Sequence, residues 1–157
     1  MRKFRRYLLS GAAVFAIGFG LLSLHAQEVE AGGASVRFRT VDIYVESKGK
    51  PLAAYQLEFS VTNGNAKIVG IEGGETPAFS EPPFYDPKAM QQDRVIIAAF
   101  CTETATVLPK GITRVATIHL QISGKAEPEF ELKLQTAADA DGHRIPAQAN
   151  TRERQTK

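Results

Sequence analysis

A ten-residue stretch, Leu52 to Val61 (LAAYQLEFSV), constrains the fold of this chain more than any other. From Tyr55 onward its apolar residues occupy every second position, and polar residues fill the positions between them. Successive side chains of a strand point to opposite faces of a sheet, so this alternation predicts a strand with one apolar and one polar face. Such a strand is typical of an antiparallel sheet that covers a core with one face only.

Further segments have strand-like patterns, and turn-forming residues separate them roughly every ten residues. Besides 52–61, the predicted strands are residues 36–45, 66–71, 94–101, 113–123, 129–135 and 143–148. No segment after residue 26 shows a convincing helical period. The pattern predicts an all-β fold, namely an antiparallel β-sandwich of the jelly-roll type.

Three local features refine this prediction. Asn63-Gly64-Asn65 predicts a tight hairpin turn between the strands on either side, because Asn and Gly tolerate positive φ. The apolar positions of 36–45 change parity at Arg39-Thr40, which predicts a bulge or a strand that switches sheets. Residues 94–101 (RVIIAAFC) are apolar on both parities, which predicts a central strand buried on both faces.

The alternation also predicts the core and the limits of the domain. Residues expected to be buried together are Leu57, Phe59, Ile97, Phe100, Ile118, Leu120 and Leu132. The sandwich is expected to span 35–148, after a flexible lead-in at 27–34 and before a disordered tail at 149–157.

The amino terminus predicts export. MRKFRR is a basic start, Tyr7 to Leu24 is apolar, and Ala26 offers a small residue for cleavage before Gln27. We expect residues 1–26 to be a signal peptide, or residues 7–24 to be an uncleaved membrane anchor. Either interpretation predicts a secreted, periplasmic or cell-surface protein.

The charge distribution argues against nucleic acid as a partner. Four of the 19 basic residues lie within residues 1–26, which contain no acidic residue, so the remainder carries 15 basic and 17 acidic residues. A nearly neutral, slightly acidic domain lacks the basic patch that binds phosphates. Contact with a membrane is expected only through residues 7–24, if they are retained.

The residues that carry catalytic chemistry are sparse, so we expect no enzyme, cofactor or metal. His119 lies on a polar strand face and His143 in a turn, and neither has the spacing of metal ligands. Neither a nucleophile elbow nor a phosphate-binding glycine loop is present. Cys101 has no intrachain partner and, at strand spacing from Ala99, is predicted to be a buried small hydrophobe.

Asp139-Ala140-Asp141-Gly142 admits two interpretations. Two carboxylates two residues apart before Gly can begin a calcium loop. His143 and Arg144 then stand where further acidic ligands would be needed, and Asp-Gly is a common hairpin turn. A simple turn is therefore favoured.

The proline-rich segment 75–92 also has two interpretations. Four prolines exclude an interior strand, yet three aromatic residues lie among them: Phe79, Phe84 and Tyr85. These rings are expected either to cap one end of the core or to form a ligand site for polysaccharide. Residues 87–92 can form one short helical turn, since Pro suits a first helical position.

Several segments resemble cohesin domains and the related sandwich-type carbohydrate-binding modules. These segments are LAAYQLEFSVTNGNAKIVGIEGG, RVIIAAF, GITRVATIHLQISG and DADGHRI, and the similarity spans Ser35 to Gln148. The resemblance implies an extracellular jelly roll without catalytic activity. Cohesins bind dockerin modules, and the carbohydrate-binding modules bind polysaccharide.

We therefore expect an exported recognition module that binds a protein partner at the cell surface. The expected partner face consists of polar outward residues, namely Gln56, Glu58, Thr117 and His119. The alternatives are a carbohydrate-binding module that uses Phe79, Phe84 and Tyr85, and a structural subunit of an envelope or secretion assembly.

Overall fold

The computed structural model describes residues 35–154. The predicted leader (1–26), the lead-in (27–34) and the last three residues lie outside this range. Between residues 35 and 154 there is no helix of the length and apolar character needed to cross a membrane.

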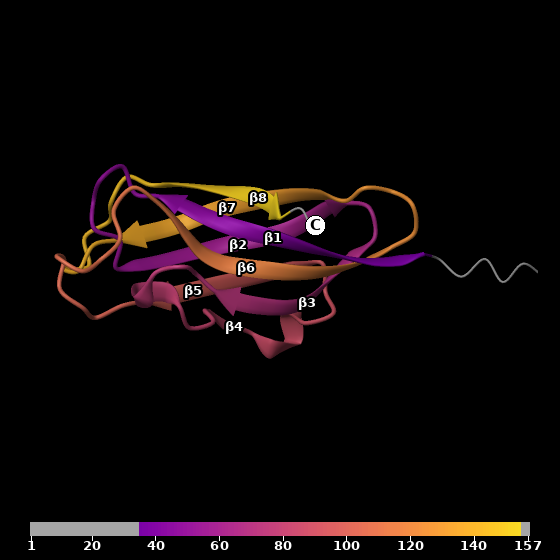
Figure 1. Ribbon diagram of the computed structural model, residues 1–157, viewed down its shortest axis with the longest axis horizontal. Coiled ribbons are helices and arrows are strands. Elements are labelled where there is room, and N and C mark those ends of the chain that lie inside the picture. The colour runs from indigo at the N-terminus through magenta and orange to yellow at the C-terminus, as the bar shows by residue number, and fades with distance from the viewer. Residues whose placement is uncertain (1–34, 155–157) are drawn as a thin grey trace, which may run out of the picture. The chain divides into compact units, whose positions relative to one another are not determined.

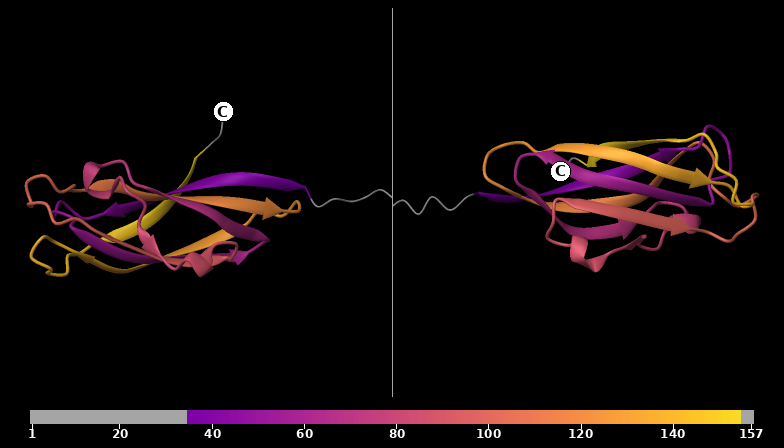
Figure 2. Two further views of the ribbon diagram at one scale, coloured as in Figure 1. Left: turned by 90° about the horizontal axis from the view of Figure 1, so that it is seen from below. Right: turned by 180° about the vertical axis from the view of Figure 1, so that it is seen from behind.

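The described chain forms two four-stranded antiparallel sheets that pack face to face (Figures 1 and 2). Sheet A has the strand order β3-β6-β1-β8, and sheet B has the order β4-β5-β2-β7. Two short 3-10 helices, η1 (Pro77–Phe79) and η2 (Pro87–Ala89), connect β3 to β4 and β4 to β5. The strands are β1 (Val36–Glu46), β2 (Ala54–Asn63), β3 (Ala66–Gly73), β4 (Phe84–Tyr85), β5 (Arg94–Phe100), β6 (Ile112–Ser123), β7 (Glu129–Ala138) and β8 (Gln148–Arg154). The prediction of an all-β antiparallel sandwich is confirmed.

The core lies between the sheets and is built from the alternating positions of β2 and β6. Leu57, Phe59, Ile97, Ile118 and Leu120 are all completely buried, as predicted. A side chain the size of Leu or Phe contributes roughly 1.5–3 kcal/mol when it is fully removed from water. Burial of these residues from both layers therefore holds the two sheets together.

Two residues of the predicted core are placed differently. Phe100 is 62% exposed, and Leu132 is only partly buried, at the margin of the core. Val95 and Ile97 of β5 face the core, so Ile96 and Phe100 face outward from sheet B. The prediction of a strand buried on both faces was wrong because no described segment covers this outer face.

The predicted irregularity at Arg39-Thr40 is also absent. The pairing of β1 with β6 runs without a shift from Val36 to Ile43, and the shift occurs at the next residue, where β6 contains the extra residue Val115. The parity change in the sequence has a different cause. Val36 and Phe38 lie on the outer face of sheet A, where Phe38 is 71% exposed.

The turn at 63–65 joins two sheets and not two paired strands. β2 pairs with β5 and β7, whereas β3 pairs with β6, so the predicted hairpin was wrong. Gly64 has a φ of +82°, as the turn prediction required, and a Cβ there would lie 2.9 Å from Pro128 Cα. Turn chemistry identified a sharp reversal, but it carried no information about which strands pair.

The last described strand corrects the predicted carboxyl terminus. Residues 148–154 form β8, which pairs with β1 from Glu46 to Thr40. The strand predicted at 143–148 is reduced to an isolated bridge between Arg144 and Ala138. The prediction of a disordered tail was wrong for residues 149–154, because pairing with β1 and the contacts of Arg154 compensate for a polar sequence.

Candidate recognition face on sheet B

The three aromatic residues of the proline-rich segment have different environments. Phe79 is 2% exposed, and its ring meets Tyr55 edge to face with centroids 5.3 Å apart. Phe79 therefore caps the core, as one of the two interpretations predicted. Phe84 and Tyr85 are neighbours on β4, so their side chains point to opposite faces. Tyr85 packs against the core, and Phe84 is 67% exposed.

Phe84 lies against Phe100 on the outer face of sheet B. The two rings are nearly parallel, with an interplanar angle of 10° and centroids 5.8 Å apart. The register explains the contact, because Phe84 is opposite Ala98 and Phe100 is the next residue on the same face. We call this cluster the aromatic patch; it consists of Phe84, Ile96, Ala98 and Phe100.

Polar side chains of β2 and β5 border the aromatic patch. Arg94 donates two hydrogen bonds of 2.8 Å to the carboxylate of Glu58, and Gln56 donates one of 2.5 Å to Gln135. The hydrogen bonds from Arg94 lower the pKa of Glu58, and Glu58 raises the pKa of Arg94. Both groups are therefore charged over the whole neutral range. We call the aromatic patch together with Gln56, Glu58 and Arg94 the recognition face.

A shallow groove of about 590 Å³ runs along this face. The walls include aromatic, aliphatic and oppositely charged side chains, namely Phe84, Asp86, Lys88, Arg94 and Ile96. Asp86 also begins η2, since its carboxylate accepts a hydrogen bond of 2.9 Å from the Lys88 amide. Of the short helical turn predicted at 87–92, Pro87–Ala89 is helical, and it forms one side of the groove.

The structure does not bring the four predicted partner-face residues together. Gln56 and Glu58 lie on the outer face of sheet B, whereas Thr117 and His119 belong to β6 in sheet A. Thr117 is completely buried, although its position predicted exposure. Only the two residues of β2 are therefore part of the recognition face.

Thr117 is covered by a hydrogen-bonded network on the outer face of sheet A. Its hydroxyl donates to Asp42 at 2.7 Å and accepts from Arg114 at 2.7 Å. Arg154 of β8 adds two hydrogen bonds to the Asp42 carboxylate, at 2.7 and 3.2 Å. The network crosses β8, β1 and β6. Sequence analysis missed it because Asp42 and Arg154 are 112 positions apart and belong to no local motif.

His119 is partly covered and lies beside the acidic side chain of Glu72. Its Nε2 atom is 2.9 Å from Glu72 Oε1, but this contact lacks the geometry of a hydrogen bond. The other ring nitrogen lies 3.4 Å from the Thr40 hydroxyl. His119 therefore lies on a polar sheet face. The two contacts of its ring nitrogens, Glu72 and Thr40, include neither a histidine nor a cysteine.

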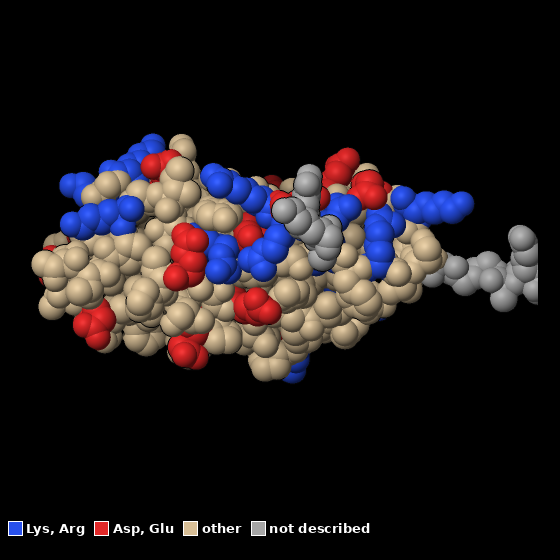
Figure 3. All heavy atoms as spheres, in the orientation of Figure 1, with Lys and Arg blue, Asp and Glu red and all other residues tan. Residues whose placement is uncertain are grey.

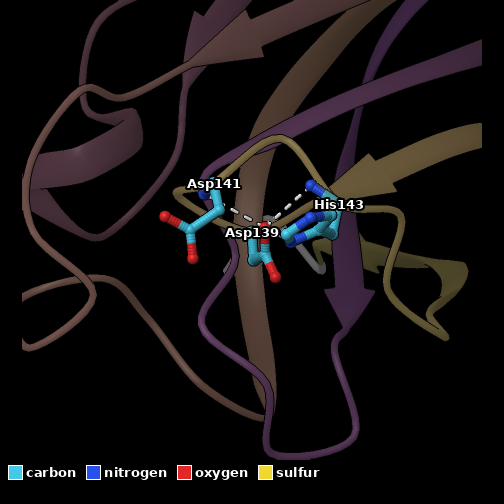
Figure 4. A group of neighbouring side chains, drawn as sticks. All are labelled: Asp139, Asp141 and His143. Atoms are coloured by element: carbon cyan, nitrogen blue, oxygen red, sulfur yellow. Dashed lines mark hydrogen bonds and ion pairs between the residues drawn. The ribbon is translucent and has the colours of Figure 1, made fainter.

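The Asp139-to-His143 segment forms a compact turn (Figure 4). One oxygen of Asp139 accepts hydrogen bonds from the amides of Asp141 (3.1 Å) and His143 (2.9 Å), and Gly142 has a φ of +80°. The segment is therefore a turn, which both interpretations require, and the absence of a calcium ion stays a prediction. Potential ligand atoms of Asp139, Asp141 and His143 lie within 4.8 Å of one another, but the Asp139 oxygen already serves the backbone.

Cys101 follows β5 and is partly buried. Its amide donates a hydrogen bond of 2.7 Å to the Ala53 carbonyl. The residue lines a hollow of about 410 Å³ together with Pro77, Ala78, Glu103 and Val107. Burial is less complete than strand spacing predicted, because β5 ends at Phe100.

The distribution of charge gives no large area of one sign on the face drawn in Figure 3, where basic and acidic side chains are interspersed. Comparison of the chain with protein-family models, with curated proteins and with solved structures found no match in any of the three. The resemblance to cohesin domains therefore stays a prediction from the sequence.

Proposed function

We propose that this protein is an exported, non-catalytic recognition module that binds a protein partner through the recognition face of sheet B. The observation that carries the proposal is the pair of stacked, solvent-exposed phenylalanines, Phe84 and Phe100. A cluster of large apolar side chains on a rigid sheet gains free energy when a partner removes it from water. We also propose that the sandwich is a jelly roll and that it is related to cohesin domains.

The chemistry around the patch favours a protein as partner. Stacking covers part of one face of each ring, which leaves fewer ring faces for a sugar but keeps edges and aliphatic groups for side-chain contacts. Arg94 and Glu58 form a preorganised ion pair beside the rings, and such a pair can orient a partner that carries complementary polar groups. Interfaces with an aromatic centre and a polar rim share this arrangement.

The test is photo-crosslinking from the recognition face in the cells that produce the protein. A photoreactive residue at Phe84 or Phe100 should capture one defined protein, and Phe84→Ala should weaken binding of that protein at least roughly tenfold. Phe38 is the matched control, because it is similarly exposed but lies on the outer face of sheet A. Equal capture from Phe38, or no capture from Phe84, would contradict the proposal.

Carbohydrate binding is the second candidate. The observation that favours it is Phe84 itself, an exposed ring that follows two prolines and lies beside Gln56 and Lys88. A ring held open in this way loses little conformational freedom when a sugar stacks on it. A glycan array that retains the parent but not the Phe84→Ala variant would favour this candidate over a protein partner.

Export is proposed from residues 1–26 alone, which lie outside the described residues. Mass spectrometry of the protein from its native cells should find an amino terminus near Gln27. Recovery of an intact Met1 in the membrane fraction would replace secretion with anchoring through residues 7–24. Recovery of intact Met1 in the soluble cytoplasm would contradict both.

A further inference from the structure

The strand β7 leaves one of its edges unpaired over most of its length. β7 is the last strand of sheet B and pairs with β2 only. At its far end the edge is covered, because Arg144 bridges Ala138 and the Ile145 amide donates to the Ala137 carbonyl at 2.9 Å. From Glu129 to Thr136 no described segment hydrogen-bonds to this edge.

Edges on the opposite side of the sandwich are covered in part. The β3 edge is met by the segment before β5, where Gln91 donates to the Ile68 carbonyl and Ile68 donates to the Gln92 carbonyl, both at 2.8 Å. β4 covers the middle of the β5 edge. A long open edge exposes unpaired donors and acceptors, and it is a template for a further strand.

The side chains of β7 are matched to a partner with the same sequence. Phe130, Leu132 and Leu134 face inward but are only partly buried, because they lie at the margin of the core. Glu131 and Lys133 face outward, with side chains 48% and 58% exposed, and form an ion pair of 3.2 Å. The pattern therefore combines partly buried apolar groups on one face with one charge of each sign on the other.

β7 runs without an extra residue of its own from Glu129 to Leu134. The next step has one, because Gln135 lies between Leu134 and Thr136, which pair with Leu57 and Gln56. At the other end the extra residue is Thr62 of β2 and not a residue of β7. A second strand with its symmetry axis at Leu132 would pair with Phe130 to Leu134, and this segment lies within the uninterrupted part.

We propose that β7 of one copy pairs antiparallel with β7 of a second copy, about a two-fold axis at Leu132. In this register Leu132 lies opposite itself, and Phe130 lies opposite the partner's Leu134. Glu131 of each copy lies opposite the partner's Lys133, so both cross-strand pairs are attractive. The contact covers the partly buried apolar residues and satisfies the open backbone edge.

Charge favours this register over the adjacent ones. Antiparallel pairing of identical edges requires an axis at a residue, because opposite residues must present their backbone groups to each other. An axis at Glu131 pairs Glu129 with the partner's Lys133 but sets two glutamates opposite each other at the centre, and an axis at Lys133 sets two lysines opposite each other. Of these three registers, only the axis at Leu132 gives attractive charge pairs without a like-charged pair. β8, the edge strand of sheet A, has no such match, since an axis at its central residue, Thr151, sets Asn150 opposite Arg152.

The dimer goes beyond the proposed function, and its contact on β7 borders the recognition face, where Lys133 lies opposite Glu58. Pairing through β7 joins the two copies of sheet B into one continuous sheet, so both recognition faces lie on the same side. A partner with two binding sites, or a polymeric partner, would then be held at two points, and its effective affinity would rise by avidity.

The decisive experiment is charge reversal, read by sedimentation velocity over a concentration series of the protein as purified from its native compartment. The parent should pass from monomer to dimer. Glu131→Lys and Lys133→Glu should each weaken dimerisation by roughly tenfold or more, because symmetry creates each like-charged pair twice. An equimolar mixture of the two variants should form heterodimers, since one strand then carries two positive charges and faces two negative charges on the other.

A cysteine pair tests the register independently of charge. In a Cys101→Ser background, Leu132→Cys should form a disulfide dimer, because directly opposite Cα atoms about 4.5–5.5 Å apart fit disulfide geometry. Phe130→Cys is the matched control, since it faces the partner's Leu134 and not itself. A parent that stays monomeric up to about 1 mM, a mixture that fails to associate, or equal crosslinking at 130 and 132 would overturn the proposal.

Discussion

The Tyr55 hydroxyl donates a hydrogen bond of 3.0 Å to the Val115 carbonyl, and this bond joins the two sheets through the core. Tyr55 belongs to β2 of sheet B, and Val115 is the extra residue that makes the β6 strand of sheet A irregular. Burial raises the pKa of Tyr55 well above its usual range. The Val115 carbonyl, at the irregular position of β6, thus accepts a hydrogen bond from a side chain of sheet B.

Tyr55→Phe should therefore destabilise the fold. The change keeps the ring and removes only the hydroxyl, so the buried Val115 carbonyl loses its side-chain donor, at a cost of about 1–2 kcal/mol. Urea denaturation followed by circular dichroism measures the difference. Tyr44→Phe is the control, because the Tyr44 ring is only partly buried and carries Arg152 over its face at 4.6 Å. Equal effects of the two changes would contradict the role of the bond.

Truncation of Phe79 should lower the stability of the fold, whereas truncation of Phe84 should weaken binding and leave stability nearly unchanged. Phe79→Ala creates a cavity beside Tyr55 and should cost about 3–5 kcal/mol of unfolding free energy. Phe84→Ala removes an exposed ring and should change stability by less than about 0.5 kcal/mol while it weakens binding. Thermal melts of both variants, beside a binding assay for Phe84→Ala, separate core capping from recognition.

Arg154 should stabilise β8 through Asp42. Arg154→Ala leaves the buried Asp42, a residue that is only 7% exposed, with one fewer partner, and the expected loss is about 1–3 kcal/mol. Hydrogen exchange should show earlier opening of the β8 amides than of those in β2. Arg152→Ala, a neighbouring change that spares Asp42, should have a smaller effect. Equal protection of β8 in the Arg154 variant and the parent would show that the network does not hold this strand.

The Glu58–Arg94 pair predicts a specific dependence on pH. The pKa of Glu58 is lowered in the folded state by its hydrogen bonds from Arg94, so the unfolded chain binds this proton more readily. The stabilisation is complete above the unfolded pKa of Glu58 and is lost as the pH falls through its folded pKa. Carboxyl NMR titration should show the Glu58 pKa rising in Arg94→Ala. The pKa of Glu127, which a hydrogen bond from Arg39 keeps low, should not change.

Strand parity predicted which side of a strand is apolar, because period-two alternation follows from backbone geometry alone. Leu57, Phe59, Ile118 and Leu120 are buried for this reason. Parity does not say what covers a face, and Phe100 shows the limit. It belongs to an apolar strand, yet the outer face of sheet B carries no further layer of the described chain.

The candidate site could be predicted only in part for the same reason. Phe84, Gln56 and Glu58 were accessible from the sequence, since an aromatic residue among prolines and polar strand positions both indicate exposure. The stacking of Phe84 on Phe100 depends on the pairing of β4 with β5. Pairing between strands is a tertiary property, and no local pattern placed Thr117 in a different sheet from Gln56.

The place of β8 beside β1 has a consequence for the biosynthesis of the protein. β1 is made early and lies inside sheet A, but one of its edges stays open until residues 148–154 have left the ribosome and, if the protein is exported, crossed the membrane. Contacts so distant along the chain form slowly. A chain that stalls before residue 148 would therefore present an unprotected strand to chaperones and proteases, and quality control can recognise the incomplete product by that strand.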